Sequence, residues 1–160
     1  NPSSGGNSSP LHQQRNIQIQ VLNNNNQVVL TKDGSLNYNQ ASGNFKGTID
    51  LGTSFKTGFY TVKVKIGQSL TTLIPGIQRI TQNQITNLPQ AILTGGDVNN
   101  DNKVDVKDFN FLMDCYADLT AARNCSDLNK KQGADLTDDG SVNQFDYNFF
   151  LRELTNRQGQ

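Results

Sequence analysis

Two twelve-residue segments repeat one pattern of acidic and amide side chains, and this pattern constrains the chain more than any other feature of its sequence. The segments are residues 97–108 and, thirty-eight residues later, residues 135–146. In both, side chains that carry oxygen stand at positions 1, 3, 5, 9 and 12, counted from the first Asp. Carboxylates held this close repel one another. The spacing therefore indicates that a cation neutralises them.

The spacing is that of an EF-hand calcium loop, in which alternate side chains turn inward and position 7 contributes its backbone carbonyl. Ca²⁺ prefers six to eight oxygen ligands, and two ions are expected here. Position 6 needs a sharp turn, which Gly140 supplies in the second loop and Asn102, tolerant of positive φ, in the first. The alternative is a pair of solvated acidic turns. The predicted ligands are Asp97, Asn99, Asp101, Lys103, Asp105 and Asp108 in the first loop, and Asp135, Thr137, Asp139, Ser141, Asn143 and Asp146 in the second.

Each loop leads directly into an amphipathic segment. Apolar side chains at helical spacing predict helices over about residues 108–119 and 146–154. Both loops depart from the EF-hand in two ways. Position 12 is Asp rather than Glu, and no helix is expected before either loop, since the first follows a strand and Gly95-Gly96.

The segments GDVNNDNKVDVKDFNFL and ADLTDDGSVNQFDYNFFL resemble the two repeats of the type I dockerin module, over about residues 95–155. The resemblance implies calcium-dependent folding, an extracellular location and binding to a cohesin-like protein. It also implies that the partner contacts positions 10 and 11 of each loop, which here are Val106, Lys107, Gln144 and Phe145.

Short alternating strands precede the loops. They are predicted over residues 16–21, 27–31, 35–38, 44–51, 59–66, 70–74, 78–80 and 90–93, with turns at residues 23–26 and at Asp33-Gly34. This pattern indicates a β-sandwich or an open barrel. The segments GNFKGTIDLG and TGFYTVKV resemble strand pairs of prealbumin-like or immunoglobulin-like surface modules. The expected fold is mainly β with a small α module: a tail at residues 1–15, a β-sandwich domain at 16–94 and a dockerin-like domain at 95–156.

Charge divides the chain in the same place. Residues 1–96 carry seven basic and two acidic side chains, whereas residues 97–160 carry seven basic and twelve acidic ones. Opposite charges of about five on the two parts permit head-to-tail attraction between copies, and the polar tail could add as a strand to a neighbouring sheet. One hypothesis is therefore a structural subunit that polymerises into a cell-surface filament. The other is an anchoring module that binds a cohesin-like protein.

The two cysteines, Cys115 and Cys125, favour a disulfide in an extracellular protein, the alternative being two reduced thiols. The 36 Asn and Gln residues also fit a protein of the cell surface. No basic face suggests nucleic-acid binding, and no apolar run is long enough to cross a membrane.

An enzyme is not expected. His12 is the single histidine and lies in the tail, which argues against a Ser-His-Asp or Cys-His arrangement. A glycosidase pair from Asp33 and Asp50 has no supporting pattern. A sugar-binding platform would have to use aromatic side chains that alternating strands more often place in a core: Tyr38, Phe45, Phe55, Phe59 and Tyr60.

Overall fold

The chain has a mainly β part and a small helical part, as expected. The computed structural model describes residues 7–122 and 125–154, so residues 1–6 of the predicted tail and 155–156 of the predicted dockerin-like domain lie outside the described residues. The elements are β1 (Gln14–Leu22), β2 (Val28–Asn39), β3 (Asn44–Lys46), β4 (Gly58–Ile66), β5 (Thr72–Leu73), β6 (Gln78–Ile80), α1 (Val106–Cys115), α2 (Leu128–Ala134) and α3 (Gln144–Glu153).

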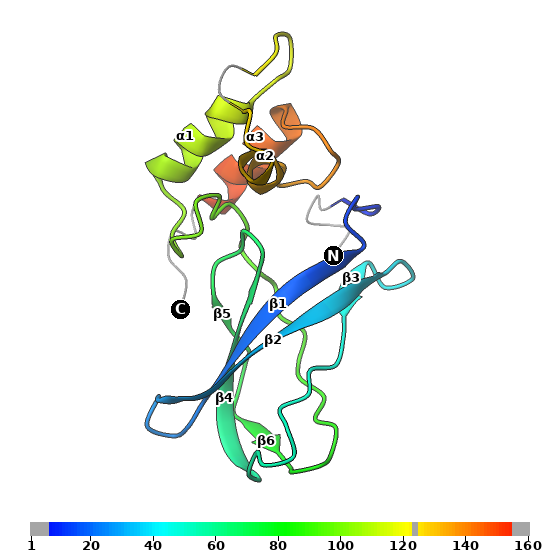
Figure 1. Cartoon of the computed structure of the whole chain (residues 1–160), viewed down its shortest axis with the longest axis vertical. Coiled ribbons are helices and arrows are strands. Elements are labelled where there is room, and N and C mark those ends of the chain that lie inside the picture. Colours follow the sequence, from blue (N-terminus) through cyan, green and yellow to red (C-terminus); the bar gives the residue numbers. More distant parts are fainter. Residues whose placement is uncertain (1–6, 123–124, 155–160) are drawn as a thin grey trace.

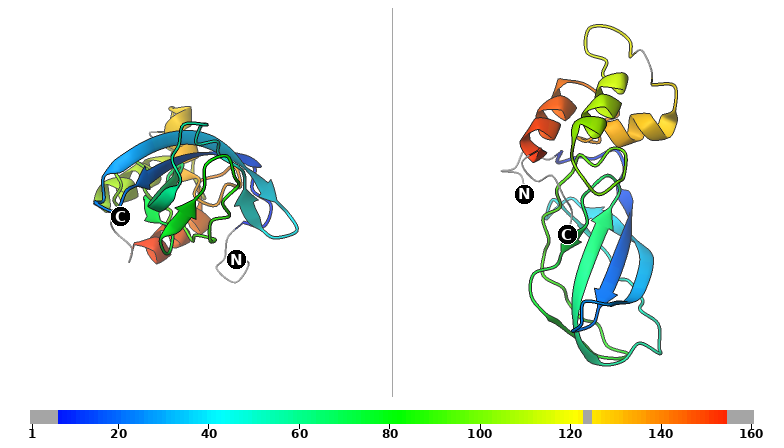
Figure 2. Two further views of the ribbon diagram at one scale, coloured as in Figure 1. Left: turned by 90° about the horizontal axis from the view of Figure 1, so that it is seen from below. Right: turned by 90° about the vertical axis from the view of Figure 1, so that its left-hand side faces the viewer.

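The six strands form one antiparallel sheet in the order β3-β2-β1-β4-β5, and β6 pairs with the other end of β4. Seen from below, the sheet curls around its interior as a half-barrel (Figure 2). The structure thus differs from the predicted β-sandwich, because one curled sheet stands where two packed sheets were expected. It corresponds to the open-barrel alternative.

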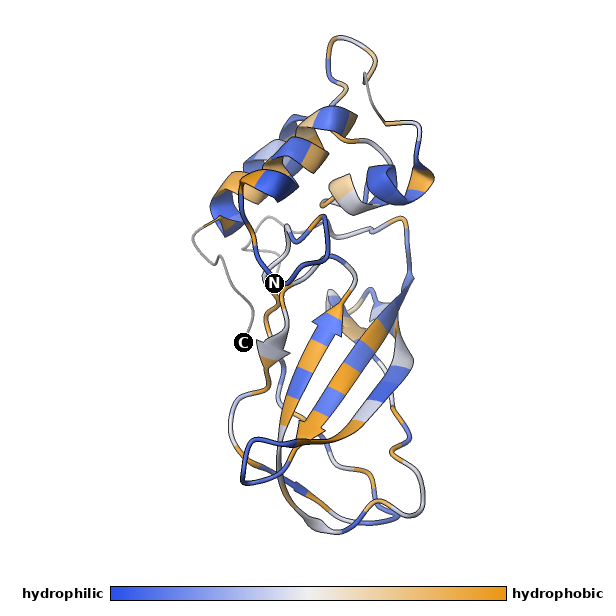
Figure 3. Cartoon of the chain, turned by 60° about the vertical axis from the view of Figure 1, so that its left-hand side comes forward, coloured by the Kyte–Doolittle hydropathy of each residue, from blue (hydrophilic) through white to orange (hydrophobic). Residues whose placement is uncertain are grey.

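Coil, not a second sheet, covers the concave face. Ile17, Ile19 and Val21 of β1 point inward and are buried, and the alternation of apolar and polar residues along the strands is visible in Figure 3. Residues 47–57 and 81–94 cross this face without forming strands, so the strand predicted at 90–93 is wrong and the one predicted at 44–51 ends at Lys46. Positive φ angles interrupt their extended backbone. Their side chains that pack on the core are Ile49, Leu51, Phe55, Ala91 and Leu93.

The Asp33-Gly34 pair does not turn the chain, because β2 runs through it unbroken. A Cβ atom on Gly34 would lie 2.9 Å from Cδ1 of Ile49. The glycine therefore lets a covering segment approach the strand closely, which is a common reason for a Gly within a strand. The turn predicted at residues 23–26 is confirmed, with the N–H of Asn26 donating to the carbonyl of Asn23.

Each predicted helix begins two residues earlier than expected. Asp105 caps α1 and Asn143 caps α3, each in a reciprocal capping box with the Asp three residues later. α1 also ends at Cys115 rather than near residue 119, because the backbone turns extended at Tyr116. The expectation that no helix precedes either loop is wrong for the second loop, because α2 ends at Ala134, directly before Asp135. The sequence does not indicate α2, since its seven residues contain Gly133 and lack a clear apolar face.

The helices pack at one end of the half-barrel (Figure 1). They enclose a second hydrophobic cluster, whose buried members are Leu70, Val104, Leu112, Cys115, Ala134, Val142 and Phe150. Leu70 precedes β5 and so belongs to the β part of the chain. Its N–H donates to the carbonyl of Thr94 at 2.8 Å. The helical cluster is therefore completed by a residue from the β part.

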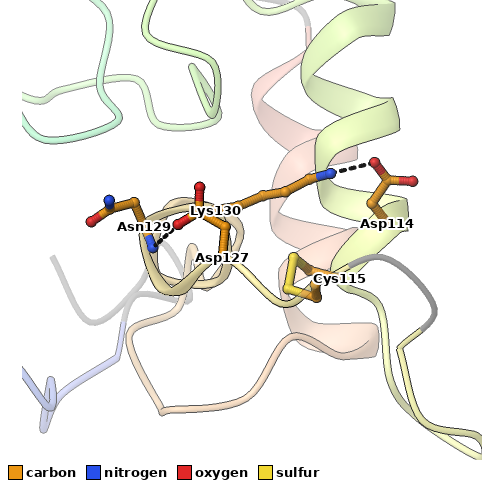
Figure 4. Close-up of a disulfide and its surroundings, with 6 residues drawn as sticks. Asp114, Cys115, Asp127, Asn129 and Lys130 are labelled. Atoms are coloured by element: carbon orange, nitrogen blue, oxygen red, sulfur yellow. Dashed lines mark hydrogen bonds and ion pairs between the residues drawn. A yellow bond between two sulfur atoms is a disulfide. The ribbon is translucent and has the colours of Figure 1, made fainter.

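The predicted disulfide between Cys115 and Cys125 is present, and it joins the end of α1 to the segment before α2. Close to it, Nζ of Lys130 on α2 lies 2.5 Å from a carboxylate oxygen of Asp114 on α1 (Figure 4). The same ammonium group lies 5.1 Å from the ring centre of Phe111. The disulfide and the contacts of Lys130 hold α2 against α1. Within the described residues, no helix has the length and apolar character needed to span a membrane.

Candidate metal centre

The two acidic loops have the same backbone turns. In the first loop Asn100 and Asn102 have φ angles of 65°, and in the second Asp138 and Gly140 have φ angles of 56° and 91°. These are positions 4 and 6 of both loops. The prediction that Asn102 takes the place of glycine at position 6 is confirmed. The left-handed residue at position 4 was not predicted.

The loops also share their hydrogen bonds. The carboxylate at position 1 accepts from the N–H of position 6, at 3.0 Å for Asp97 and 2.8 Å for Asp135. The carboxylate at position 5 accepts from the N–H of position 7, at 3.1 Å for Asp101 and 2.9 Å for Asp139. Each short polar side chain thus fixes the turn that follows it.

Position 12 closes each loop. Its carboxylate accepts from the N–H groups of positions 3 and 9, at 3.0 and 2.9 Å for Asp108 and at 2.8 and 2.9 Å for Asp146. Both side chains are fully buried. Burial raises the pKa of Asp108, and Asp97 and Asp101 raise it further, against the lowering effect of its two backbone donors.

Position 1 is where the loops differ. Asp97 is fully buried, and its Oδ1 is a buried side-chain oxygen with no hydrogen-bond partner. Its Oδ2 accepts from Asn102 and lies 2.6 Å from Nζ of Lys65, a residue of β4. Asp135 is partly exposed and is held by the N–H groups of Asp139 and Gly140. Burial raises the pKa of Asp135, more than these two bonds lower it.

The β part of the chain holds the first loop at three points. Besides the Lys65 ion pair, the N–H of Asp97 donates to the carbonyl of Gln68 at 3.1 Å. The N–H of Thr71 donates to Oδ1 of Asn102 at 2.7 Å. The end of β4 and the turn after it therefore support positions 1 and 6, an arrangement that the loop sequence itself could not indicate.

The N-terminal segment holds the second loop. Asp138, at position 4, is buried, and its carboxylate accepts from the backbone N–H of His12 and from the guanidinium of Arg15 at 2.9 Å. Its carboxylate also meets the His12 ring, and its carbonyl accepts from the N–H of Leu11 and the amide of Asn7. Burial alone would raise the pKa of Asp138, but the bonds from His12 and Arg15 outweigh it and lower that pKa.

The predicted partner-binding residues are the first two residues of α1 and of α3, and all four are exposed. Val106 is 68% exposed and Phe145 is 69% exposed. Large apolar side chains at this exposure contribute little to the fold. By contrast, four of the aromatic residues considered for sugar binding pack against one another as tilted ring pairs, Tyr38 with Phe45 and Phe55 with Tyr60.

Across residues 7–122 and 125–154, the structure contains no group of three or more His, Cys, Asp or Glu side chains gathered as a metal-binding cluster. The calcium ligands predicted from the spacing therefore remain predictions. Comparison of the chain with protein-family models, with curated proteins and with solved structures finds no match.

Proposed function

We propose that this chain is a non-enzymatic, extracellular protein-binding module whose helical part folds on two calcium ions. The observation that carries the proposal is the repeated loop: the same side chains at the same positions make the same hydrogen bonds twice. The ligands would be the twelve residues predicted above, with Lys103 and Ser141 contributing backbone carbonyls.

The donor set fits a hard cation, because it consists of carboxylate, amide, hydroxyl and carbonyl oxygens. The unpartnered Oδ1 of Asp97 supports the first site, since a buried carboxylate oxygen without a partner is costly. The small helical cluster supports a structural role, because so few buried residues contribute little stability alone. Bound calcium would neutralise the carboxylates. Because the site would form only in the folded chain, the free energy of calcium binding would add to the stability of the fold.

Positions 10 and 11 of the loops support protein docking. Val106, Lys107, Gln144 and Phe145 project from the first turns of α1 and α3, where calcium would order the backbone just before them. An exposed Val and an exposed Phe suit the centre of a protein interface, with polar neighbours around them. The partner would be a cohesin-like protein.

The placement of the N-terminal segment favours docking over a filament built by tail exchange. Leu11, His12 and Arg15 bind Asp138 of the same chain, so this part of the tail already has a partner in its own fold. To act as a donor strand, the segment would have to leave these contacts.

Light scattering of the pure chain in millimolar calcium tests the proposal, with a type I cohesin as probe. A monomer that binds the cohesin, and that loses binding when Val106 and Phe145 become Ala, supports docking. Asp118→Ala is the matched control, because Asp118 is exposed and lies outside both loops. Large particles of the pure chain would instead support the filament, and a monomer without cohesin affinity would contradict this choice of partner.

A further inference from the structure

We infer that Lys65 acts in place of a metal charge at the first loop, so that it weakens calcium binding there and makes the first loop less dependent on calcium than the second. This inference rests on the proposed calcium function and deepens it. Among the contacts described, Lys65 is the side-chain cation that meets a position-1 carboxylate. Lys65 does not belong to either predicted loop, and it lies 32 residues before Asp97 in the sequence.

The ammonium group of Lys65 contacts one carboxylate oxygen of Asp97, Oδ2. Oδ2 takes both the ammonium group, at 2.6 Å, and the N–H of Asn102, whereas Oδ1 is left without a partner. Because the Asp97 side chain is fully buried and that of Lys65 is only 20% exposed, the pair is screened weakly by water. The ammonium group therefore stabilises the charged Asp97 when no calcium is bound.

The second loop has no equivalent contact in the described part of the chain. Asp135 is held by backbone N–H groups, and the ion pairs described at this loop join His12 and Arg15 to Asp138 at the non-ligating position 4. The loop thus has a support for its backbone but no positive charge on its first carboxylate. It should depend more strongly on calcium for its order.

Lys65 consequently stabilises the calcium-free first loop more than the calcium-loaded one, because a bound divalent cation would lie near the same ammonium group and repel it. By carboxylate count the first loop should be the tighter site, with Asp97, Asp101, Asp105 and Asp108 against Asp135, Asp139 and Asp146. Lys65 offsets that extra negative charge.

The test is a calcium titration of the full chain, after removal of calcium with a chelator, for the wild type and for Lys65→Met. We expect one of the two dissociation constants to fall about tenfold, and the other to change less than twofold. Asp97→Asn and Asp135→Asn assign each constant to its loop. The thermal shift on adding calcium should also be larger in Lys65→Met than in the wild type.

Lys63→Met is the matched control, because it removes the same charge from the same face of β4 two residues earlier. Lys65→Arg keeps the charge and should keep the wild-type constants. Lys65→Gln, which can still donate to Asp97, carries the test if circular dichroism shows that Lys65→Met does not fold without calcium.

Unchanged or weaker affinity in a folded Lys65→Met or Lys65→Gln protein would overturn the inference while leaving the calcium proposal intact. An equal gain in Lys63→Met would also overturn it, since the effect would then be general charge. A wild-type chain that takes up no calcium would overturn both proposals.

Discussion

The two acidic loops are alike inside and different in what supports them. Both turn at positions 4 and 6 and close on a buried Asp at position 12. The first is held by the end of β4 and the turn after it, the second by the N-terminal segment. A short loop therefore specifies its own turns, whereas its charge and its stability depend on distant residues that fold against it.

The largest effect should come from position 12, where the loops are the same. Asp108→Ala and Asp146→Ala should each cost about 2–4 kcal/mol of unfolding free energy, because each removes a buried acceptor of two backbone N–H groups. Chemical denaturation of each variant measures this cost. Asp118→Ala, an exposed control, should stay within about 0.5 kcal/mol of the wild type. A large effect in only one loop would show that the shared contacts are not equivalent.

Loss of the disulfide should have the next largest effect on stability. It should destabilise α1 more than α3, the two helices that follow the loops. Cys115 ends α1, whereas α3 has no such staple in the described residues. Replacing both cysteines with Ala should destabilise the helical part by about 2–3 kcal/mol, since the closed loop is short. Denaturation with and without reductant measures this. An equal rise in hydrogen exchange in α1 and α3 would contradict the expectation that the disulfide stabilises α1 in particular.

Removing the carboxylate of Asp138 should loosen the second loop alone. Asp138→Ala removes the acceptor for His12 and Arg15, with an expected cost of about 1–3 kcal/mol, near the lower end because Arg15 is partly exposed. Hydrogen exchange should quicken at the N–H groups of Gly140 and Ser141 but not at those of Asn102 and Lys103. Equal changes in both loops would mean that the N-terminal segment supports the whole helical part.

Acidification should weaken calcium binding in both loops. The pKa values of Asp108 and Asp135 are raised, so each carboxyl takes up a proton at a higher pH than an unfolded Asp does. Calcium needs the charged forms, so its affinity should fall as the pH drops through the raised pKa values of these two groups. Without calcium the sign reverses: these two groups favour the fold at low pH, and that contribution is lost as pH rises through their folded pKa values.

Asp138 should behave in the opposite way, because its pKa is lowered. Its contribution is present above the unfolded pKa of Asp and is lost as pH falls through the lower folded value. Calcium titrations at a series of pH values in the wild type and in Asp138→Ala distinguish the two effects. A calcium affinity that does not change down to about pH 4, near the ordinary pKa of Asp, would contradict the roles given to Asp108 and Asp135.

The smallest effect on stability should come from the exposed positions proposed for docking. Phe145→Ala should change the unfolding free energy by less than about 0.5 kcal/mol, because the side chain is mostly in water. The same change should weaken binding to the probe cohesin at least tenfold if Phe145 lies at the centre of the interface. Isothermal titration measures both wild type and variant, and unchanged affinity would remove Phe145 from the interface.

What could be predicted from the sequence is mostly local. The turn at Asn102 and the helices after the loops follow from Asx side chains that bond to backbone groups a few residues away. The pairing of Cys115 with Cys125 is the single intramolecular pairing that two cysteines allow.

The rest depends on contacts between distant residues. Nothing in the spacing of the loops indicates that Lys65 meets Asp97 or that Arg15 meets Asp138. The β-sandwich was expected because short alternating strands suit either two sheets or one curled sheet, and local pattern does not distinguish them. The local pattern predicts a turn at Asp33-Gly34, whereas in the fold the glycine allows Ile49 to approach the strand closely.

The most direct test is the number of calcium ions held by the purified full chain, measured by native mass spectrometry after chelation and return of calcium. We expect two ions in the wild type, one in Asp97→Asn and one in Asp135→Asn. A wild-type chain that keeps its fold and carries no calcium would contradict the proposal that the helical part folds on two calcium ions.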